Sequence, residues 1–375
     1  MKWLKVHTLN RDSLVLKKLL AEGNLRTLRT TECRGSMIIY NGHEYVNFSS
    51  NDYLGLSSRL ELQDEFFDGL PRSHQMVMSN PSSRLMTGNS FEYNELEQSI
   101  ASFMQTEAAL VLSSGYILNS SLLRAITSRE DVILADKLVH SSLIDGLKLS
   151  DCPWFRFAHN DMQNLRTMLI KHHGKRIVVV IESLYSMDGD RAPLNDLAQL
   201  QIEFDFTLVV DEAHAMAIFG KSGQGLCHAV KNLRVDYLVA TLGKAICSAG
   251  AYVACSSLDK ELLINRLKGV IFSTALPPIT LSWSKFIIDR VAGFSAERDH
   301  LRHLIELMDG RSQIVPIIAN SASRAIELEK KLKDAGFWVT AIRQPTVAAG
   351  TERIRISLTA AHSEAQVKEL CKNIG

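Results

Sequence analysis

The pattern of apolar and polar residues alternates between strand-like and helix-like stretches over most of the chain. From about residue 90 to 280, short apolar or β-branched runs such as RIVVVIE and FTLVV are separated by helix-like stretches such as NELEQSIASFM and LNDLAQLQIEF. This alternation favours a mainly parallel sheet that is covered by helices on both faces. The pattern therefore predicts an α/β fold.

The pattern changes towards both ends of the chain. Residues 11–30 have an approximate helical periodicity, and the strand-like pieces SMIIY and EYVNF follow on either side of Asn41-Gly42, a strong hairpin signal. After Pro277-Pro278, a long helical stretch leads into a smaller mixture of strands and helices. We predict an N-terminal helix and hairpin segment over 1–45, a large domain over 46–280 and a small C-terminal α+β domain over 281–375.

Composition and charge exclude several classes of function. The chain has 375 residues, of which 46% are hydrophobic and 22% charged, with a net charge of +1. No basic stripe dominates, so neither nucleic acid nor a membrane surface is expected as a partner. No apolar run suits a signal peptide or a membrane span. The six cysteines form no C-x-x-C pair, so we expect reduced thiols, no metal and a cytoplasmic location.

Reactive side chains follow four of the predicted strands. In an open parallel sheet, functional groups gather where strands end at their carboxyl edge. Each group taken alone has an ordinary structural explanation, such as a helix N-cap, a core histidine or a solvated lysine. Together they would place hydroxyls, carboxylates, two imidazoles and an amine at one edge. The groups are Ser113-Ser114-Gly115-Tyr116, Asp136 with His140, Asp211 with His214, and Thr241-Leu242-Gly243-Lys244.

This set of side chains suits pyridoxal phosphate (PLP). The cofactor needs a lysine amine for its aldehyde and a carboxylate for its ring nitrogen, and its phosphate suits a helix N-terminus with hydroxyl donors. On this hypothesis Asp211 faces the ring nitrogen, His214 reaches the phenolic oxygen and Glu212 points elsewhere. The chain has no G-x-x-x-x-G-K-[ST], and no G-x-G-x-x-G follows a strand, which argues against nucleotide and dinucleotide sites.

An ordered series of motifs resembles the α-oxoamine synthases, which are fold-type-I PLP enzymes that condense an amino acid with an acyl-CoA and lose CO2. The resemblance extends from about residue 45 to the end of the chain and implies a fold-type-I transferase. Within the family, the sequence is most similar to members that join L-alanine to a pimeloyl thioester, carried by CoA or by a carrier protein. The motifs include NFSSNDYLGLSS (47–58), SSGYILNSS (113–121), RFAHNDM (156–162), VVDEAHAMAIFG (209–220), TLGKA (241–245) and RIRISLTAAH (353–362).

The resemblance also implies roles for individual residues. Lys244 would hold the cofactor covalently and then transfer protons, while Asp211 would pair with the ring nitrogen and His214 with the O3′ oxygen. His140 would stack over the ring, and Ser186 would be a hydrogen-bond partner near it. The residues implied around the phosphate are Ser114, Gly115, Tyr116 and Thr241, with Thr274 from the neighbouring subunit of a homodimer.

The substrate contacts follow from the same resemblance. Arg355 would bind the amino-acid carboxylate in a bidentate geometry that a lysine cannot copy, and Asn51 would lie close to that carboxylate. Arg26 is a candidate for the distal carboxylate of a pimeloyl chain, although an exposed charge on the N-terminal helix explains it equally well. Relatives usually have a glycine-rich turn where this chain reads SNPSSR (79–84), so an altered acyl donor stays open as an alternative.

Two other interpretations stay open. The protein could be another member of the family that uses glycine with acetyl-CoA or serine with a long acyl-CoA. It could also be a catalytically idle protein that uses the fold to bind a partner or a ligand. The second interpretation is disfavoured because an idle copy should have lost at least one of the reactive residues, namely Lys244, Asp211, His140, His214 and Arg355.

Overall fold

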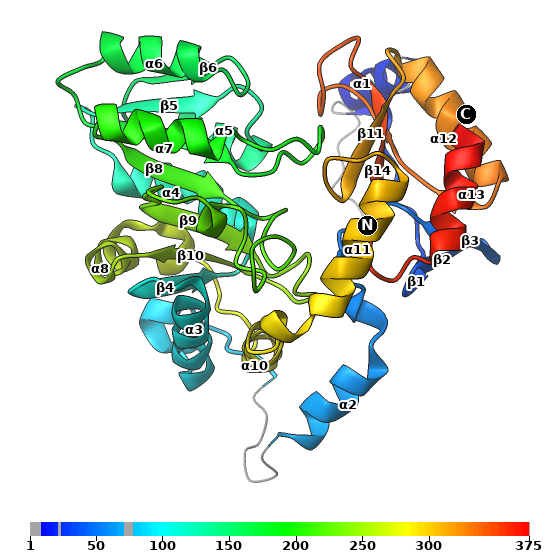
Figure 1. Cartoon of the computed structure of the whole chain (residues 1–375), viewed down its shortest axis with the longest axis horizontal. Coiled ribbons are helices and arrows are strands. Elements are labelled where there is room, and N and C mark those ends of the chain that lie inside the picture. The colour runs from blue at the N-terminus through cyan, green and yellow to red at the C-terminus, as the bar shows by residue number, and fades with distance from the viewer. Residues whose placement is uncertain (1–8, 22–23, 71–77, 375) are drawn as a thin grey trace. The chain divides into compact units, whose positions relative to one another are not determined.

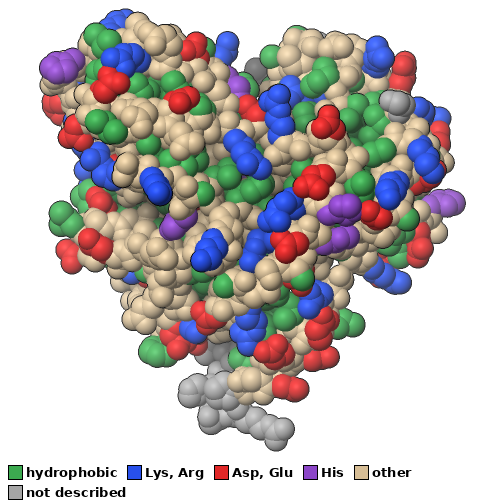
Figure 2. All heavy atoms as spheres, viewed as in Figure 1, with side chains coloured by type: hydrophobic (Ala, Val, Ile, Leu, Met, Phe, Trp, Pro, Cys, Tyr) green, Lys and Arg blue, Asp and Glu red, His purple; other side chains and the backbone are tan. Residues whose placement is uncertain are grey.

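The computed structural model describes residues 9–21, 24–70 and 78–374, which form two compact units (Figure 1). The small unit contains the described residues up to Ser50 together with the chain from Leu304 onwards. The large unit contains the described residues from Asn51 to His303. On the face shown in Figure 2, basic and acidic side chains are interspersed, in keeping with the net charge of +1.

A seven-stranded sheet forms the centre of the large unit, in the order β4-β10-β9-β8-β7-β5-β6. The strands from β6 to β9 pair in parallel, whereas β10 is antiparallel to both of its neighbours. All six residues of β7 are buried, as expected for a strand with helices on both faces. The predicted α/β fold class is confirmed. The strands are β4 (Ala108–Leu112), β5 (Val132–Asp136), β6 (Trp154–Phe157), β7 (Ile177–Glu182), β8 (Thr207–Asp211), β9 (Tyr237–Thr241) and β10 (Ala251–Cys255).

Helices flank this sheet (Figure 1), and three of them begin at side-chain caps. Ser114, Asp161 and Ser256 each accept a hydrogen bond from the backbone N–H three residues further on. The main helices are α2 (Leu60–Asp68), α3 (Phe91–Met104), α4 (Gly115–Ile126), α5 (Ser141–Leu149), α6 (Met162–Lys171), α7 (Leu194–Glu203), α8 (Ser257–Arg266), α9 (Lys268–Ile271), α10 (Pro278–Ile288) and α11 (Ser295–Leu307). Short helical turns are η1 (Leu56–Ser58), η2 (Arg84–Gly88), η3 (Cys227–Ala229) and η4 (Val291–Gly293).

The small unit has two sheets, in the orders β1-β2-β3-β12 and β11-β14-β13. Asn41 and Gly42 join β2 to β3 with φ angles of 51° and 78°, so the predicted hairpin is confirmed by the antiparallel pairing of these strands. Its strands are β1 (Glu32–Arg34), β2 (Met37–Tyr40), β3 (His43–Asn47), β11 (Ile314–Ile318), β12 (Phe337–Trp338), β13 (Ala341–Ile342) and β14 (Arg353–Ser357). Its helices are α1 (Leu9–Ala21), α12 (Ala322–Asp334) and α13 (Glu364–Ile374).

The compact units differ from the predicted segments in where they begin and end. The hairpin belongs with the C-terminal strands because β12 pairs in parallel with β3, with Phe337 opposite Val46. Helix α10 stays in the large unit because it packs on α3. Helix α1 ends at Ala21 rather than near residue 30.

The turn after β8 is organised by the buried Glu212. Its Oε1 atom accepts hydrogen bonds from the backbone N–H groups of Leu226 and Cys227, each at 2.8 Å. Gly225 lies against this carboxyl group with a φ of 109°, and a Cβ atom there would lie 1.7 Å from Glu212 Oε2. Glycine is therefore required at position 225 both for backbone conformation and for space.

We expect Gly225→Ala to lower the free energy of unfolding by at least about 3 kcal/mol, because backbone strain and overlap with Glu212 add together. The matched control is Gly174→Ala. Gly174 has a φ of 87° but no atom within 4 Å of an added Cβ. Its alanine variant should therefore lose only about 1–2 kcal/mol of stability, from backbone strain alone. Urea denaturation measures both changes, and equal losses would contradict this account of the turn.

Candidate active site

Lys244 begins a chain of hydrogen bonds in the large unit. Lys244 follows β9, and its Nζ atom lies 2.8 Å from His214 Nε2. His214 Nδ1 lies 2.6 Å from the Tyr53 hydroxyl, which donates to Asn51 Oδ1 at 3.0 Å. Since the Tyr53 hydrogen is directed at Asn51, its oxygen accepts from His214 Nδ1, and Nε2 is left to accept from Lys244. The structure thus brings three predicted site residues, Lys244, His214 and Asn51, together in one chain of contacts.

Asp211 is the last residue of β8 and is almost fully buried, with 6% of its surface exposed. Its Oδ2 atom accepts a hydrogen bond from Asn119 Nδ2 at 2.7 Å, and Oδ1 accepts from the Ala213 N–H at 2.8 Å. Asn119 also donates to Ser142 Oγ at 3.1 Å. These contacts hold the carboxylate in one orientation.

His140 caps the N-terminus of α5 through its ring. Nδ1 accepts a hydrogen bond from the Ser142 N–H at 3.2 Å, so the proton of a neutral ring lies on Nε2. Part of the side chain reaches solvent, yet desolvation lowers the pKa of His140. The Asp211 carboxylate opposes this shift, and the Lys244 charge adds to it. His140 is therefore a neutral imidazole at neutral pH.

Glu182 ends β7 beside Asp211, its partner in the parallel register. It is 2% exposed and accepts a hydrogen bond from the backbone N–H of His140. Burial and the nearby Asp211 carboxylate raise the pKa of Glu182 well above its ordinary range. The raised pKa favours the protonated form of Glu182, which avoids placing two buried negative charges side by side.

The predicted phosphate residues lie where α4 begins beside β9. Ser114 caps the helix, with Oγ accepting from the Ile117 N–H at 3.3 Å. A Cβ atom on Gly115 would lie 3.9 Å from Thr241 Cβ, so the helix start and the end of β9 are neighbours. Thr241 Oγ1 donates to the Gly250 carbonyl at 3.1 Å. Within the described part of the chain, the buried Ser113 Oγ has no hydrogen-bond partner.

Three other predicted site residues of the large unit lie on separate segments. The Tyr116 hydroxyl donates to the Asp145 carboxylate on α5. Ser186 is partly buried in the loop between β7 and α7. Thr274 is exposed, and its backbone forms an isolated β-bridge with Ser83.

The two predicted substrate arginines belong to the small unit. Arg355 lies on β14, is 8% exposed and donates from its NH1 group to Ser357 Oγ at 2.5 Å. Arg26 is exposed and donates to Thr346 Oγ1 at 3.2 Å. Arg355 is thus the buried, oriented guanidinium of the pair.

The unusual segment 79–84 is anchored through its last residue. Arg84 NH1 lies 2.6 Å from Glu97 Oε1 and donates to the Val111 carbonyl at 2.9 Å. Its guanidinium carbon lies 3.9 Å from the centre of the Tyr93 ring. Arg84 is 10% exposed at its side chain, so it stabilises this segment from within the fold.

Sequence reasoning did not assign roles to Tyr53, Asn119, Ser142 or Glu182. Tyr53 and Asn119 lie inside motifs that carry the family resemblance, so their positions were available as a signal. Ser142 lies in ADKLVHSSLIDG (135–146), another segment that resembles the family, whereas Glu182 becomes significant only when the sheet register is known.

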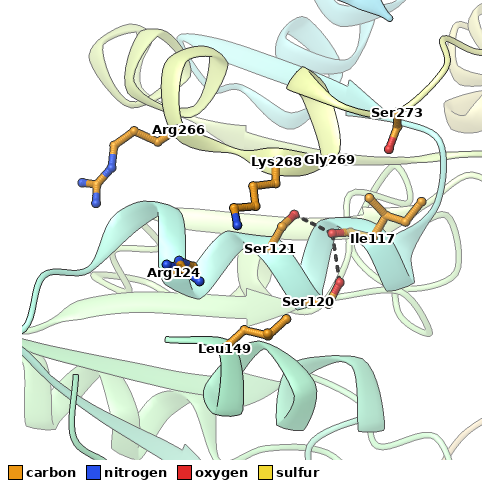
Figure 3. Close-up of a pocket in the computed structure, with 9 residues that line it drawn as sticks. All are labelled: Ile117, Ser120, Ser121, Arg124, Leu149, Arg266, Lys268, Gly269 and Ser273. Carbon is orange, nitrogen blue, oxygen red and sulfur yellow. Dashed lines mark hydrogen bonds between the residues drawn. The ribbon is translucent and has the colours of Figure 1, made fainter. Parts of the chain in front are cut away.

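A pocket of about 400 Å³, here called the basic pocket, opens beside α4 (Figure 3). Arg124, Arg266 and Lys268 line it with serine hydroxyls, and none of the described lining residues is acidic. Lys268 extends from α9 towards α4, which carries Ser121 and Arg124 (Figure 3). None of the predicted site residues lines this pocket.

Two further observations concern the described residues as a whole. No group of three or more histidine, cysteine, aspartate or glutamate side chains among them could hold a metal ion. None of their helices is both long enough and apolar enough to cross a membrane.

Comparison with other sequences relates nearly the whole chain to enzymes of one kind. The family model described as aminotransferase class I and II matches residues 43–374. A putative 8-amino-7-oxononanoate synthase of Haemophilus influenzae is 42% identical over 369 residues, covering 94% of this chain and 97% of the relative. The 8-amino-7-oxononanoate synthase of Haemophilus ducreyi is 42% identical over 377 residues, covering 95% and 97% of the two chains.

Solved structures have the same fold. An S. paucimobilis serine palmitoyltransferase with bound PLP is 23% identical, with a TM-score of 0.88 and coverage of 99% of this chain and 98% of its own. At that identity the likeness concerns the fold alone. An 8-amino-7-oxononanoate synthase from Francisella tularensis is 27% identical, with a TM-score of 0.74 and coverage of 88% and 96%.

These matches confirm the family resemblance found in the sequence. The family match across residues 43–374 and the 42% identity over nearly the full length show that this chain belongs to the aminotransferase class I and II family and, within it, to the α-oxoamine synthases.

Proposed function

We propose that this protein is a PLP-dependent 8-amino-7-oxononanoate synthase, which joins L-alanine to a pimeloyl thioester with loss of CO2 in biotin biosynthesis. The Lys244–His214 contact of 2.8 Å, beside the buried Asp211, is the observation that carries the assignment of PLP chemistry. The substrate assignment is supported by the curated relatives at 42% identity that have this name.

The residues present fit the cofactor. Lys244 supplies the amine for its aldehyde, and the buried Asp211 supplies the carboxylate for its ring nitrogen. The phosphate dianion suits the start of α4, where Ser114 and the unpartnered, buried Ser113 hydroxyl lie. When bound, the cofactor supplies an electron-withdrawing ring that stabilises negative charge at the α-carbon of the substrate.

Asp211 and Glu182 provide one negative charge rather than two. Asn119 and the Ala213 N–H orient the Asp211 carboxylate, so little reorganisation is needed when it pairs with a protonated ring nitrogen. The raised pKa of Glu182 favours its neutral form. The neutral His140 can lie against an aromatic ring without adding a second positive charge to it.

Lys244 is the group that moves protons at the α-carbon. Its amine is held by His214 Nε2, and His214 is oriented in turn by the Tyr53 hydroxyl. This chain of hydrogen bonds directs the amine and places an imidazole beside it. Arg355, buried on β14, is proposed to bind the alanine carboxylate, with Asn51 near it.

The acyl donor is proposed to place its phosphate groups in the basic pocket. Among the described residues, Lys268 has no ion pair and Arg266 donates only to the Thr127 carbonyl. Two cations without carboxylate partners suit the phosphates of CoA or of a carrier's phosphopantetheine. Arg26 remains the residue proposed to contact the distal carboxylate of the acyl chain.

The protein is proposed to work as a cytoplasmic homodimer. The exposed position of Thr274 on the segment bridged to Ser83 supports this, since the family resemblance implies that this threonine serves the phosphate site of the partner subunit.

The assignment is tested by alanine-dependent release of thiol from a series of acyl thioesters. The purified protein should take up PLP and should turn over L-alanine with pimeloyl-CoA faster than glycine with acetyl-CoA or serine with palmitoyl-CoA. Preference for either alternative pair would replace the proposed substrates. A protein that takes up no PLP would overturn the enzyme assignment altogether.

Asp211→Asn should reduce kcat by at least about 100-fold, equivalent to ~2.7 kcal/mol of transition-state stabilisation, because the amide cannot hold a proton on the ring nitrogen by charge. Glu212→Gln is the matched control, since it changes the adjacent buried carboxyl group, which accepts a hydrogen bond from the Leu226 N–H. Burial raises the pKa of Glu212, so its amide variant should keep near-native turnover. A fully active Asp211→Asn would refute the role given to this carboxylate.

Arg266→Ser combined with Lys268→Ser should raise KM for pimeloyl-CoA about tenfold and leave KM for L-alanine unchanged, since ~1.4 kcal/mol of attraction is lost. The pimeloyl thioester of a phosphate-free thiol should show no such change. Arg129→Ser with Lys221→Ser removes the same charge from exposed positions elsewhere in the large unit. If both pairs of substitutions raise KM equally, the effect comes from net charge and the pocket plays no part.

A further inference from the structure

A histidine outside the Lys244 group lies between two carboxylates. His159 Nδ1 is 2.9 Å from Asp136 Oδ1, and His159 Nε2 is 2.8 Å from Asp190 Oδ2. The side chains are 23%, 1% and 19% exposed for His159, Asp136 and Asp190. We call these three residues the His159 clamp. None of them has a part in the chemistry described above.

The clamp connects three segments that follow different strands. Asp136 is the last residue of β5, His159 lies between β6 and α6, and Asp190 lies between β7 and α7. β5 is flanked in the sheet by β6 and β7. The clamp therefore ties together the ends of three adjacent parallel strands, at the edge where the active site lies.

Two of these segments present residues assigned to the cofactor. Asp136 Oδ1 also accepts from the Leu138 N–H at 2.8 Å, in the short turn that ends at His140. The Asp190 carbonyl accepts from the Tyr185 N–H at 3.0 Å, and the Tyr185 carbonyl accepts from the Gly189 N–H at 2.9 Å. These two bonds close a tight loop around Ser186. The clamp thus spans from the His140 turn to the Ser186 loop.

The surroundings of His159 leave its ring little freedom. The Asn160 N–H donates to Asp136 Oδ2 at 2.9 Å, and Asn160 Nδ2 donates to Asp190 Oδ2 at 2.8 Å. The Tyr185 ring stands edge-on to the imidazole, with ring centres 4.4 Å apart at 90°. Asn160 therefore holds both carboxylates, and Tyr185 packs against the ring that lies between them.

This geometry requires a proton on both ring nitrogens. Burial disfavours the charged ring, but the hydrogen bonds to Asp136 and Asp190 outweigh it and raise the pKa of His159 to about 10. Because the pKa is raised on folding, the stabilisation is complete below the unfolded value of about 6.5. It declines as the pH rises towards 10 and is lost above that pH. The imidazolium therefore persists through the neutral range.

We propose that His159 is a positioning residue for catalysis, whose charged ring holds the His140 turn and the Ser186 loop in register around the cofactor. The expected effect on kcat rests on the proposed function. The expected effect on PLP binding does not depend on which substrates the enzyme uses. Replacing the cation leaves Asp136 and Asp190 facing each other as like charges. The two segments then separate, and the cofactor loses the contacts proposed for His140 and Ser186.

The test compares His159→Gln with His172→Gln in the otherwise intact protein. His172 is a partly exposed histidine that stacks on Phe155, and among the described residues its charged neighbours are lysines, so it controls for the loss of an imidazole. We expect His159→Gln to weaken PLP binding to the apoprotein about tenfold and to lower kcat about tenfold, with KM for L-alanine changed less than about twofold. His172→Gln should match the wild type in all three measurements.

A stabilising role without positioning gives a different result. In that case His159→Gln would lower the melting temperature while PLP affinity and kcat stay within twofold of the wild type, and this outcome would overturn the proposal. Loss of PLP affinity together with an unchanged KM for L-alanine supports it. The PLP titration needs neither alanine nor thioester. It therefore tests the role of His159 independently of the proposed substrates.

If His159→Gln does not fold, Asp190→Asn provides a second test of the proposal. This variant retains an oxygen acceptor for His159 Nε2 but removes one of the two charges. We expect PLP affinity to fall severalfold, and the His159 Cε1 signal in carbon NMR of histidine-labelled protein to titrate at lower pH than in the wild type. A wild-type His159 signal that titrates near pH 6.5, or an Asp190→Asn variant with unchanged titration and PLP affinity, would refute the clamp.

Discussion

The parallel register of β7, β8 and β9 is the constraint on which the active site depends. In this register Glu182 lies opposite Asp211, and Asp211 lies opposite Val239, two residues before Thr241. Three strands thus deliver their final polar residues to one edge, directly before the turns that carry His214 and Lys244. A slip of one residue in β8 would point Asp211 to the other face of the sheet. Dense apolar packing of these strands makes such a slip costly, because all six residues of β7 and the last four of β8 are buried.

The site combines many titratable groups with few net charges. Burial next to Asp211 raises the pKa of Glu182 and favours its neutral form, and desolvation lowers the pKa of His140 and favours its neutral ring. The His214 tautomer is assigned by the direction of the Tyr53 hydroxyl. The remaining charges are the Asp211 carboxylate and the Lys244 amine, which are the two groups that the proposed chemistry needs in charged or exchangeable form. Preorganised charges of this kind are effective because they require no rearrangement during the reaction.

Further along the same edge of the sheet, a histidine between carboxylates is charged rather than neutral. Beyond the ends of β5, β6 and β7, the carboxylates of Asp136 and Asp190 meet a charged His159 rather than a neutral one. There the charged pairs hold turns together, whereas around Asp211 neutral partners surround a single charge. The difference follows from the partners: each nitrogen of His159 faces a carboxylate, while His140 Nδ1 faces a backbone N–H. One fold thus supports both a reactive centre and the connections that hold its loops.

The sequence by itself determined the fold class, the hairpin at Asn41-Gly42 and the residues at the strand ends, since periodicity and turn chemistry are local properties of the chain. The family resemblance pointed to Lys244, Asp211, His140 and His214. Tertiary structure alone decided that Tyr53 contacts His214, that Asn119 donates to Asp211, and that His159 lies between Asp136 and Asp190. It also joined the N-terminal hairpin to the C-terminal strands through β3 and β12. These relations link residues far apart in the chain, and local patterns cannot encode which distant partners a buried polar atom will find.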